Sequence, residues 1–243
     1  MYKVITHTIR EEHFTHPATA EYALTGGHMG NAHVYGGHMG SHMGNVMART
    51  SGIRGEFSSP AAVLYRGWIR NTMETYVNNL RGALVSIHST GEEVPLLEQR
   101  IASSIDDIVA MLRPYYSTGV TNVLKQGLSD YTTDLLDFFK AHKDGKPTSD
   151  IENRIAQHAT AIADAMAMAN PHWRRDESLS YYTWFADAFK NQSAARKAKN
   201  WGEDQAAFDS ARETFLTGMP DQATSLSQYI AKGVISQYPQ KFR

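Results

Sequence analysis

The sequence predicts an all-α protein, an up-and-down antiparallel bundle of five to six helices preceded by an extended N-terminal arm with one short β-strand. Two observations predict this fold class. Apolar side chains recur every three or four positions from residue 58 onward, whereas residues 10–57 show neither a helical nor a strand period. The segments between the periodic stretches are short, which favours antiparallel neighbours. We therefore expect an assembly arm over residues 1–57 and a helical bundle over residues 58–243.

A short β-strand is expected at residues 2–9, where YKVITHTI is rich in β-branched and aromatic side chains. A single strand is not stable alone, and the rest of the sequence contains no convincing second strand. The strand is therefore expected to pair with a sheet edge on another copy of the chain, through Tyr2, Val4, Ile5 and Ile9.

The most unusual segment is residues 26–45, GGHMGNAHVYGGHMGSHMGN. Seven of the eleven histidines lie in the first 42 residues, and nine of the eighteen glycines fall within residues 26–55. Because glycine has no side chain to bury, such a segment becomes ordered only against a metal ion, another domain or a neighbouring subunit. We expect it to lie flat on a partner while Tyr35, Met39 and Met43 fill small pockets there.

The same segment has a second interpretation as a metal site. A glycine-rich chain can wrap one ion so that His28, His33, His38 and His42 all reach it. Imidazole with thioether suits copper(I), and imidazole alone suits zinc, nickel or copper(II). Dedicated sites hold their ligands with a rigid surrounding shell, and nothing in this segment orients the rings. If the segment docks on a partner, no cofactor is expected. If it is a metal site, the expected cofactor is copper or zinc.

The first helix of the bundle is expected to begin at Ser59-Pro60, where a hydroxyl acceptor precedes a proline whose missing N–H costs nothing in the first turn. The break at Ser89-Thr90-Gly91 should end it. Its buried face is expected to comprise Leu64, Trp68, Thr72, Tyr76, Leu80, Ala83 and Ile87.

Three further helices follow. The second runs from near Pro95 to Pro114, the third from about Ser117 to the turn at residues 143–147, and the fourth from a cap at Asp150 to Asn170-Pro171. Their apolar stripes are Leu97, Ile101, Ile105, Ile108 and Leu112; Val120, Leu124, Leu128, Tyr131, Leu135 and Phe138; and Ile151, Ile155, His158, Ile162 and Met166.

A fifth helix is expected to continue past Trp201 towards Phe215, with a bend at Gly202. Gly218 and Pro220 interrupt it. The last helix carries an apolar stripe of Leu226, Ile230 and Val234.

The positions of the polar residues in the bundle favour structural rather than catalytic roles. His158 lies on an apolar stripe and is expected to be a hydrogen-bonded core histidine, while His88 and His142 lie near helix C-termini. An acidic row at helical spacing, expected to face solvent, consists of Asp130, Asp134 and Asp137. The sequence contains neither a nucleophile elbow nor a phosphate-binding loop, so we do not expect an enzyme.

Composition narrows the range of partners. The net charge of −1 provides no basic footprint for nucleic acid, and no apolar run reaches the length of a membrane span. The absence of cysteine excludes disulfides, thiolate metal sites and a cysteine nucleophile. We expect a protein made in the cytoplasm that binds neither nucleic acid nor a membrane.

Four pieces of the helical body are distinctive in their order and spacing: DDIVAMLRPYYS at residues 106–117, ANPHW at 169–173, the tract from Ala195-Arg196 to Trp201, and the ending LSQYIAKGVISQYPQKF at 226–242. In these pieces the chain resembles a family of uncharacterised bacterial all-helical proteins. The resemblance implies a helical bundle and leaves the N-terminal arm outside it.

The same family resemblance implies histidines within several bundle helices. They would align with Trp68, Tyr131, Trp184 and Arg212 of this chain. None of these side chains can replace an imidazole ligand, so a shared imidazole site would be lost here. The resemblance therefore implies an old bundle put to a scaffold use.

Two functional hypotheses follow from the sequence. The first is a structural protein whose arm docks on neighbouring subunits of a large assembly, such as a viral particle or another protein shell. Ordering a residue costs about 1–2 kcal/mol of backbone entropy, so a long arm needs an extensive partner surface. The alternative is a metal-handling protein that binds copper, zinc or nickel through the arm histidines.

Overall fold

The computed structural model describes residues 57–218 and 224–243, and within these ranges every regular element is helical, which confirms the all-α class. The α-helices are α2 (Pro60–Ile87), α3 (Val94–Ala110), α4 (Thr118–Lys143), α5 (Ser149–Ala169), α6 (Arg175–Lys197), α7 (Trp201–Arg212) and α8 (Leu226–Gln237). A π-helical turn, Glu213–Thr217, continues α7, and a 3₁₀ turn, Pro239–Phe242, follows α8. The strand expected at residues 2–9 and the glycine-rich segment lie outside the described residues.

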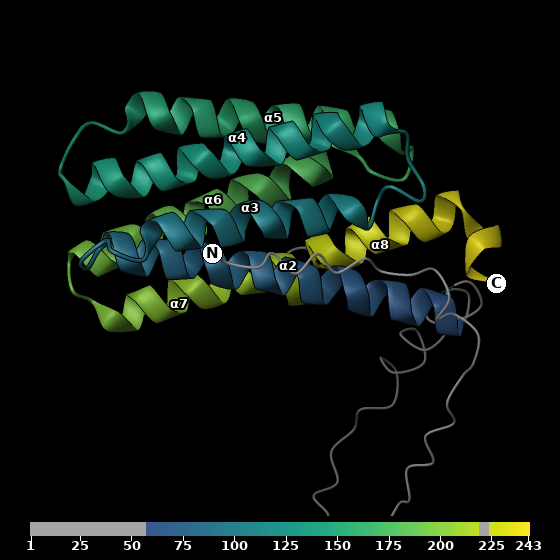
Figure 1. Ribbon diagram of the computed structural model, residues 1–243, viewed down its shortest axis with the longest axis horizontal. Helices are drawn as coiled ribbons and strands as arrows, with labels where there is room; N and C mark the ends of the chain where they lie inside the picture. The colour runs from purple at the N-terminus through teal and green to yellow at the C-terminus, as the bar shows by residue number, and fades with distance from the viewer. Residues whose placement is uncertain (1–56, 219–223) are drawn as a thin grey trace, which may run out of the picture. The chain divides into compact units, whose positions relative to one another are not determined.

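The helices of the bundle lie side by side along a common direction, as Figure 1 shows. Helix α2 packs against α3 and α8, α4 packs against α5, and α6 contacts α4, α5 and α7. Helices α3 and α4 share less contact than the pairs α2–α3, α4–α5, α5–α6 and α6–α7. A groove lies between α3 and α4 on the bundle surface.

Helix starts follow the expected capping chemistry at most positions. The Ser59 hydroxyl accepts a hydrogen bond from the backbone N–H of Ala62, and Ser225 with Gln228 forms a complete capping box at α8. The cap predicted at Asp150 is wrong, because Thr148 is the N-cap of α5. Asp150 lies in the first turn, where its carboxylate faces the positive end of the helix dipole.

The buried face predicted for the start of α2 is also wrong. Leu64 and Trp68 are 73% and 48% exposed, and the core side chains there are Ala62, Tyr65 and Ile69. Apolar and aromatic residues occupy both sides of the first three turns, so the period alone fits either face. From Tyr76 to the end of the helix the prediction is confirmed, with Tyr76, Leu80, Ala83 and Ile87 buried.

The long fifth helix predicted from the sequence is two helices, α6 and α7. The chain turns at Lys199, whose φ of 56° lies in the left-handed region, and the Asn200 side chain then accepts from the N–H of Glu203 to cap α7. Gly202, the expected bend, lies in the first turn of α7. A left-handed lysine carries no sequence signal, because that conformation usually selects glycine or asparagine.

Stacked aromatic rings form the centre of the core. The ring of Phe215, from the π-helical turn, lies 3.9 Å from Phe185 of α6 and 6.1 Å from Tyr76 of α2, measured between centroids. The buried phenol groups have hydrogen-bond partners, since Tyr76 pairs with the Thr132 hydroxyl and Tyr131 donates to the backbone carbonyl of Tyr182. These contacts connect α2, α4, α6 and the π-helical turn.

Candidate functional site

The predicted site residues belong to the N-terminal segment and lie outside the described residues. They are the metal candidates His28, His33, His38 and His42, and the partner-binding candidates Tyr2, Val4, Ile5, Ile9, Tyr35, Met39 and Met43. Within residues 57–218 and 224–243, no group of three or more His, Asp or Glu side chains is arranged to hold a metal ion. The metal interpretation therefore depends on the arm histidines alone.

A buried serine shared by two histidines is the most distinctive polar cluster of the bundle. His88 caps the end of α2, His142 lies in the last turn of α4, and Ser193 comes from α6. The Ser193 hydroxyl lies 2.9 Å from His88 Nε2 and 3.0 Å from His142 Nδ1. The sequence predicted both histidines near helix ends, but gave no sign that Ser193 would join them.

Both rings of this cluster favour the neutral form. Burial, followed by the proximity of His142 and Arg196, lowers the pKa of His88 to about 4, and burial followed by Lys197 lowers the pKa of His142. The hydroxyl has one hydrogen, so it can donate to one neutral ring while it accepts the N–H of the other. Desolvation thus outweighs the favourable helix dipole at these C-termini.

Ser193 resembles an activated nucleophile in its partners but not in its surroundings. A serine beside a neutral imidazole is the pair that nucleophilic catalysis uses. Here the side chain is fully buried, with 0% of Ser193 exposed. Lys197 also closes the cluster by donating to the backbone carbonyl of His142 at 2.6 Å. In this arrangement the cluster joins the C-terminal ends of α2 and α4 to α6, and its hydroxyl is buried.

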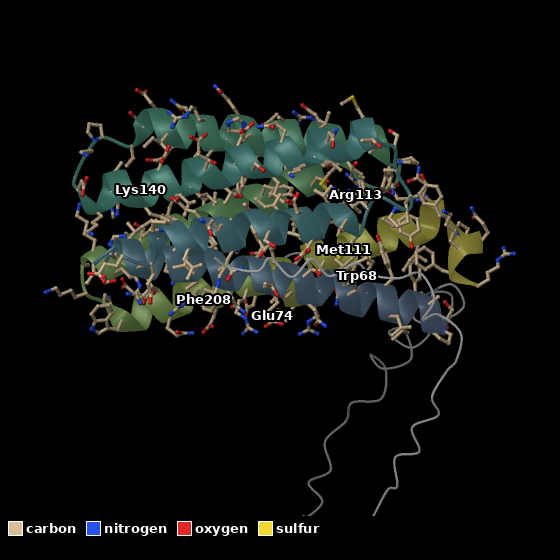
Figure 2. The ribbon with its side chains drawn as sticks, in the orientation of Figure 1. Trp68, Glu74, Met111, Arg113, Lys140 and Phe208 are labelled. Carbon is tan, nitrogen blue, oxygen red and sulfur yellow. The ribbon has the colours of Figure 1, made fainter. Side chains whose placement is uncertain are left out.

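A second buried network lies next to it around Asp204, which is 3% exposed. This carboxylate lies 3.0 Å from Arg196 Nη2 and 3.9 Å from Arg81 Nη2, and it accepts a hydrogen bond from Gln192 at 2.8 Å. The Arg81 guanidinium also lies 4.0 Å from the centroid of the Phe208 ring. Asp204 therefore connects α2, α6 and α7, and Figure 2 labels Phe208 on α7 beside α2.

In the acidic row of α4, Asp134 does not face solvent as the sequence predicted, whereas Asp130 and Asp137 are partly exposed. Asp134 is 6% exposed and accepts from Arg154 Nε at 2.8 Å, with His158 Nε2 3.3 Å away. The side chain of His158, predicted to be in the core, is 31% exposed. The close packing of α4 on α5 buries the acid and leaves the imidazole at the rim.

The four positions that the family resemblance relates to histidines do not converge. Tyr131 is fully buried, whereas Trp68 and Trp184 are 48% and 38% exposed. Trp184 donates to Ser210, and the partly exposed Arg212 pairs with Glu74 at 2.7 Å. These side chains do not line a common interior site.

An exposed apolar strip runs along the first turns of α2. It consists of Val63, Leu64 and Trp68, which are 49%, 73% and 48% exposed. The Trp68 ring meets the buried Tyr65 ring edge-on, with centroids 6.4 Å apart, and projects from α2 in Figure 2. The strip begins six positions after Phe57, the first described residue, and therefore lies where residues 1–57 join the bundle.

Comparisons with protein-family models, curated proteins and solved structures found no match for this chain. None of the helices in the described ranges is both long and apolar enough to cross a lipid bilayer. The resemblance to bacterial helical proteins stays a prediction.

Proposed function

We propose that this protein is a structural protein, an antiparallel helical bundle whose N-terminal arm, with a short strand at residues 2–9, docks on neighbouring copies in a large assembly. The observation that supports it most directly is the apolar strip of Val63, Leu64 and Trp68. Neighbouring exposed apolar side chains are a feature of interaction surfaces on soluble proteins. Burying them against a neighbour contributes about 25 cal/mol per Å² of apolar surface.

The position of the strip also supports assembly. Because it lies where residues 1–57 join the bundle, a neighbour that covers it is within reach of the arm. The net charge of −1 gives little long-range repulsion between copies. A repeating lattice, such as a virus particle or another protein shell built in the cytoplasm, provides the extensive surface that ordering a long arm requires.

The bundle and the N-terminal arm are proposed to have different roles. The described residues of the bundle contain their own aromatic core, formed around Tyr76, Phe185 and Phe215. Buried polar networks around Ser193 and Asp204 connect α2 and α6 with α4 and with α7. The described residues thus form a core of their own, against which Phe57 also packs, and the preceding part of the arm is the part proposed to contact other subunits. Catalysis is not part of this proposal.

Deletion of residues 1–57 tests the proposal. We expect a truncated chain with an unchanged helical circular-dichroism spectrum and a cooperative thermal transition, but without the high-mass species that the full chain forms. Analytical ultracentrifugation over a range of concentrations measures the second property. A full chain that stays monomeric throughout, or a truncated chain that unfolds, would contradict the proposal.

A further inference from the structure

The surface at the start of α2 is basic as well as apolar. Arg66 and Arg70 are exposed, two positions before and after Trp68, and neither makes an ion pair or a hydrogen bond with another described residue. Residues 57–73 contain no Asp or Glu, and neither does α8, which packs against α2. Arginine and tryptophan are among the side chains that dominate the binding energy of protein interfaces. The surface is therefore suited to a protein partner that presents carboxylates.

A hollow lies beside this surface, between α2 and α8. Its lining consists of Val63, Arg66, Gly67 and Arg70 of α2 with Ser227 and Gln228 of α8. An added Cβ at Gly67 would meet nothing within 4 Å, so the backbone of α2 is open to a neighbour at this point. An apolar side chain from outside can therefore pack against Val63 and the bare helix backbone, between the two arginines.

Two copies of this surface do not fit against each other. A symmetric contact would bring four arginines together, two from each copy, without a carboxylate from α8 or the first turns of α2. Like charges placed opposite one another oppose binding. The partner is therefore a different surface, and between copies of one chain such a contact is head-to-tail.

The start of α3 has the complementary features. Leu96 is 52% exposed in the first turn, and the exposed Glu92 and Glu93 lie four and three positions before it, a spacing that brings side chains together on a helix. Neither glutamate makes an ion pair with another described residue, and Lys143 reaches this loop only to donate to the Ser89 carbonyl at 3.2 Å. Among the large exposed apolar side chains of the described ranges, only Leu96 has two unpaired carboxylates within four positions.

The nearest unpaired cation on the same helix does not cancel this acidic pair. Arg100 lies four positions after Leu96, one turn further along α3, and therefore on the side of Leu96 away from both glutamates. A neighbour that approaches the loop before α3 meets Glu92 and Glu93 first.

The two surfaces lie too far apart to pair within one chain. From Val63 to Ile87, α2 rises about 36 Å at 1.5 Å per residue, and α3 starts beyond that end. Figure 1 shows the first turns of α2 and the start of α3 at opposite ends of this helix pair. Any contact between the two surfaces is therefore a contact between copies.

We propose that the start of α2 on one copy receives the start of α3 from the next copy. Leu96 enters the hollow beside Gly67, and the two glutamates lie opposite Arg66 and Arg70. The inference rests on the assembly function above and names the two surfaces that meet. Each copy carries both surfaces, so each binds one neighbour at either end, and the repeated contact closes a ring or extends a filament.

The spacing of the charges agrees with this pairing. Arg66 and Arg70 are one helical turn apart, about 6 Å along the axis, and the Cα atoms of consecutive residues such as Glu92 and Glu93 are about 3.8 Å apart. Both separations are short compared with the length of an arginine side chain. A guanidinium group binds a carboxylate through two parallel hydrogen bonds, so each pair also fixes the orientation of the neighbour.

A charge exchange in the full-length protein tests the contact. One variant carries Arg66→Glu with Arg70→Glu, and the other carries Glu92→Arg with Glu93→Arg. Each variant alone opposes like charges, so we expect its assembly midpoint, measured by analytical ultracentrifugation, at about tenfold higher concentration than that of the native chain. A one-to-one mixture pairs reversed surfaces with each other and native surfaces with each other. Its midpoint should return to within about twofold of the native value.

A control variant carries Glu203→Arg with Glu213→Arg, two exposed glutamates at the start of α7 and in the π-helical turn. It has the same net charge as the second variant, because both replace two glutamates by arginines, and it should assemble like the native chain. Single variants that assemble like the native chain, or a mixture that assembles no better than they do, overturn the pairing while the assembly function stands. A native chain that never assembles contradicts the function itself.

Two further measurements do not depend on how the charge-reversed variants fold. For the native chain, raising the salt from 0.1 to 1 M shortens the Debye length from about 10 Å to about 3 Å, and the midpoint should rise about tenfold. Leu96→Ser keeps every charge and removes the side chain that enters the hollow, so its midpoint should also rise about tenfold, with thermal unfolding unchanged. A midpoint that does not rise with salt, or a Leu96→Ser variant that assembles like the native chain, overturns the inference.

Discussion

Gly233 of α8 lies directly against the indole of Trp173, so that an added Cβ would lie 2.1 Å from Nε1 and 2.5 Å from Cδ1. The tryptophan is 1% exposed and is surrounded by core side chains, so it has little room to move. The contact fixes α8 onto the loop between α5 and α6. No residue other than glycine fits at position 233 without displacing the ring.

Gly233→Ala should therefore lower the free energy of unfolding by about 1–3 kcal/mol, through overpacking. Urea denaturation measures the change. Gly67→Ala, where an added Cβ meets nothing within 4 Å, is the control and should stabilise the exposed helix by about 0.5–1 kcal/mol. Combined with Trp173→Phe, the cost of Gly233→Ala should shrink, and strictly additive effects would disprove the steric explanation.

The histidine pair around Ser193 predicts a loss of stability in acid. In the unfolded chain a histidine titrates near pH 6.5, while the pKa of His88 in the fold is about 4 and the pKa of His142 is also lowered. Between pH 6.5 and 4 the unfolded state thus binds more protons, and stability falls as the pH falls. For the half-buried His88 ring we expect about 1–2 kcal/mol over this window.

Urea unfolding of the full chain at pH 7, 6, 5 and 4 measures this slope. His88→Gln keeps a polar side chain near Ser193 but cannot titrate, so its slope should be smaller than that of the native chain. His172→Gln is the control, because His172 is exposed and lies outside the cluster. If His88→Gln and His172→Gln gave the same slope as the native chain, the cluster would not be the source of acid sensitivity.

Asp204 neutralises two arginines that have little access to water, since the side chains of Arg81 and Arg196 are 21% and 17% exposed. Asp204→Asn leaves both guanidinium groups without their counter-charge, so we expect about 3–5 kcal/mol less stability by urea denaturation. Asp176→Asn, which removes an exposed partner of Arg174, should change nothing measurable. A small effect at Asp204 would show that water or Gln192 compensates the charge.

The apolar strip on α2 predicts a surface variant that loses assembly and keeps its fold. Leu64→Ser removes the most exposed apolar side chain of the strip, so the assembly midpoint should rise about tenfold while thermal stability stays the same. Val123→Ser on α4, also more than half exposed, is the control for a general loss of surface apolarity. Equal midpoints for the two variants would exclude the strip as an interface.

Calorimetric titration of the full chain with copper(I), copper(II), zinc and nickel distinguishes the metal-handling alternative. Under the assembly proposal we expect no stoichiometric binding tighter than the micromolar range. Submicromolar binding of one ion would favour a metal-handling protein. The joint replacement of His28, His33, His38 and His42 by alanine should then abolish it.

The sequence predicts well those helices that have a clear apolar period and a capping residue. The prediction fails where a turn has no residue signal or where two faces of a helix are equally apolar. The limits of α4 follow from Ser117 and the lysine-rich turn near residue 143, and the stripe of Leu226, Ile230 and Val234 predicts α8, whose capping residue Ser225 the structure adds. At Leu64 two faces are equally apolar, and only contact with α3 and α8 selects one. At Lys199 the backbone adopts a conformation that its residue type does not indicate.

The polar clusters were beyond prediction for a different reason. Ser193 meets His88 across more than one hundred positions of sequence and His142 across more than fifty, and each residue alone suits an ordinary helix. The burial of Asp134 depends on how closely α5 lies against α4. The spacing of acidic residues along α4 alone carries no information about that packing. Long-range hydrogen bonds of this kind become visible only once the helix pairs are known.

The π-helical turn at Glu213–Thr217 accommodates one residue more than a regular α-helical turn would. Shortening the chain there by one residue would make the turn regular, but it would change the direction in which Phe215 leaves the helix and move its ring away from Phe185. The extra residue of the turn thus fixes which of its side chains faces the core. Length changes belong in the lysine-rich loop after α4, where the same insertion would extend a surface turn and leave the packing of the rings untouched.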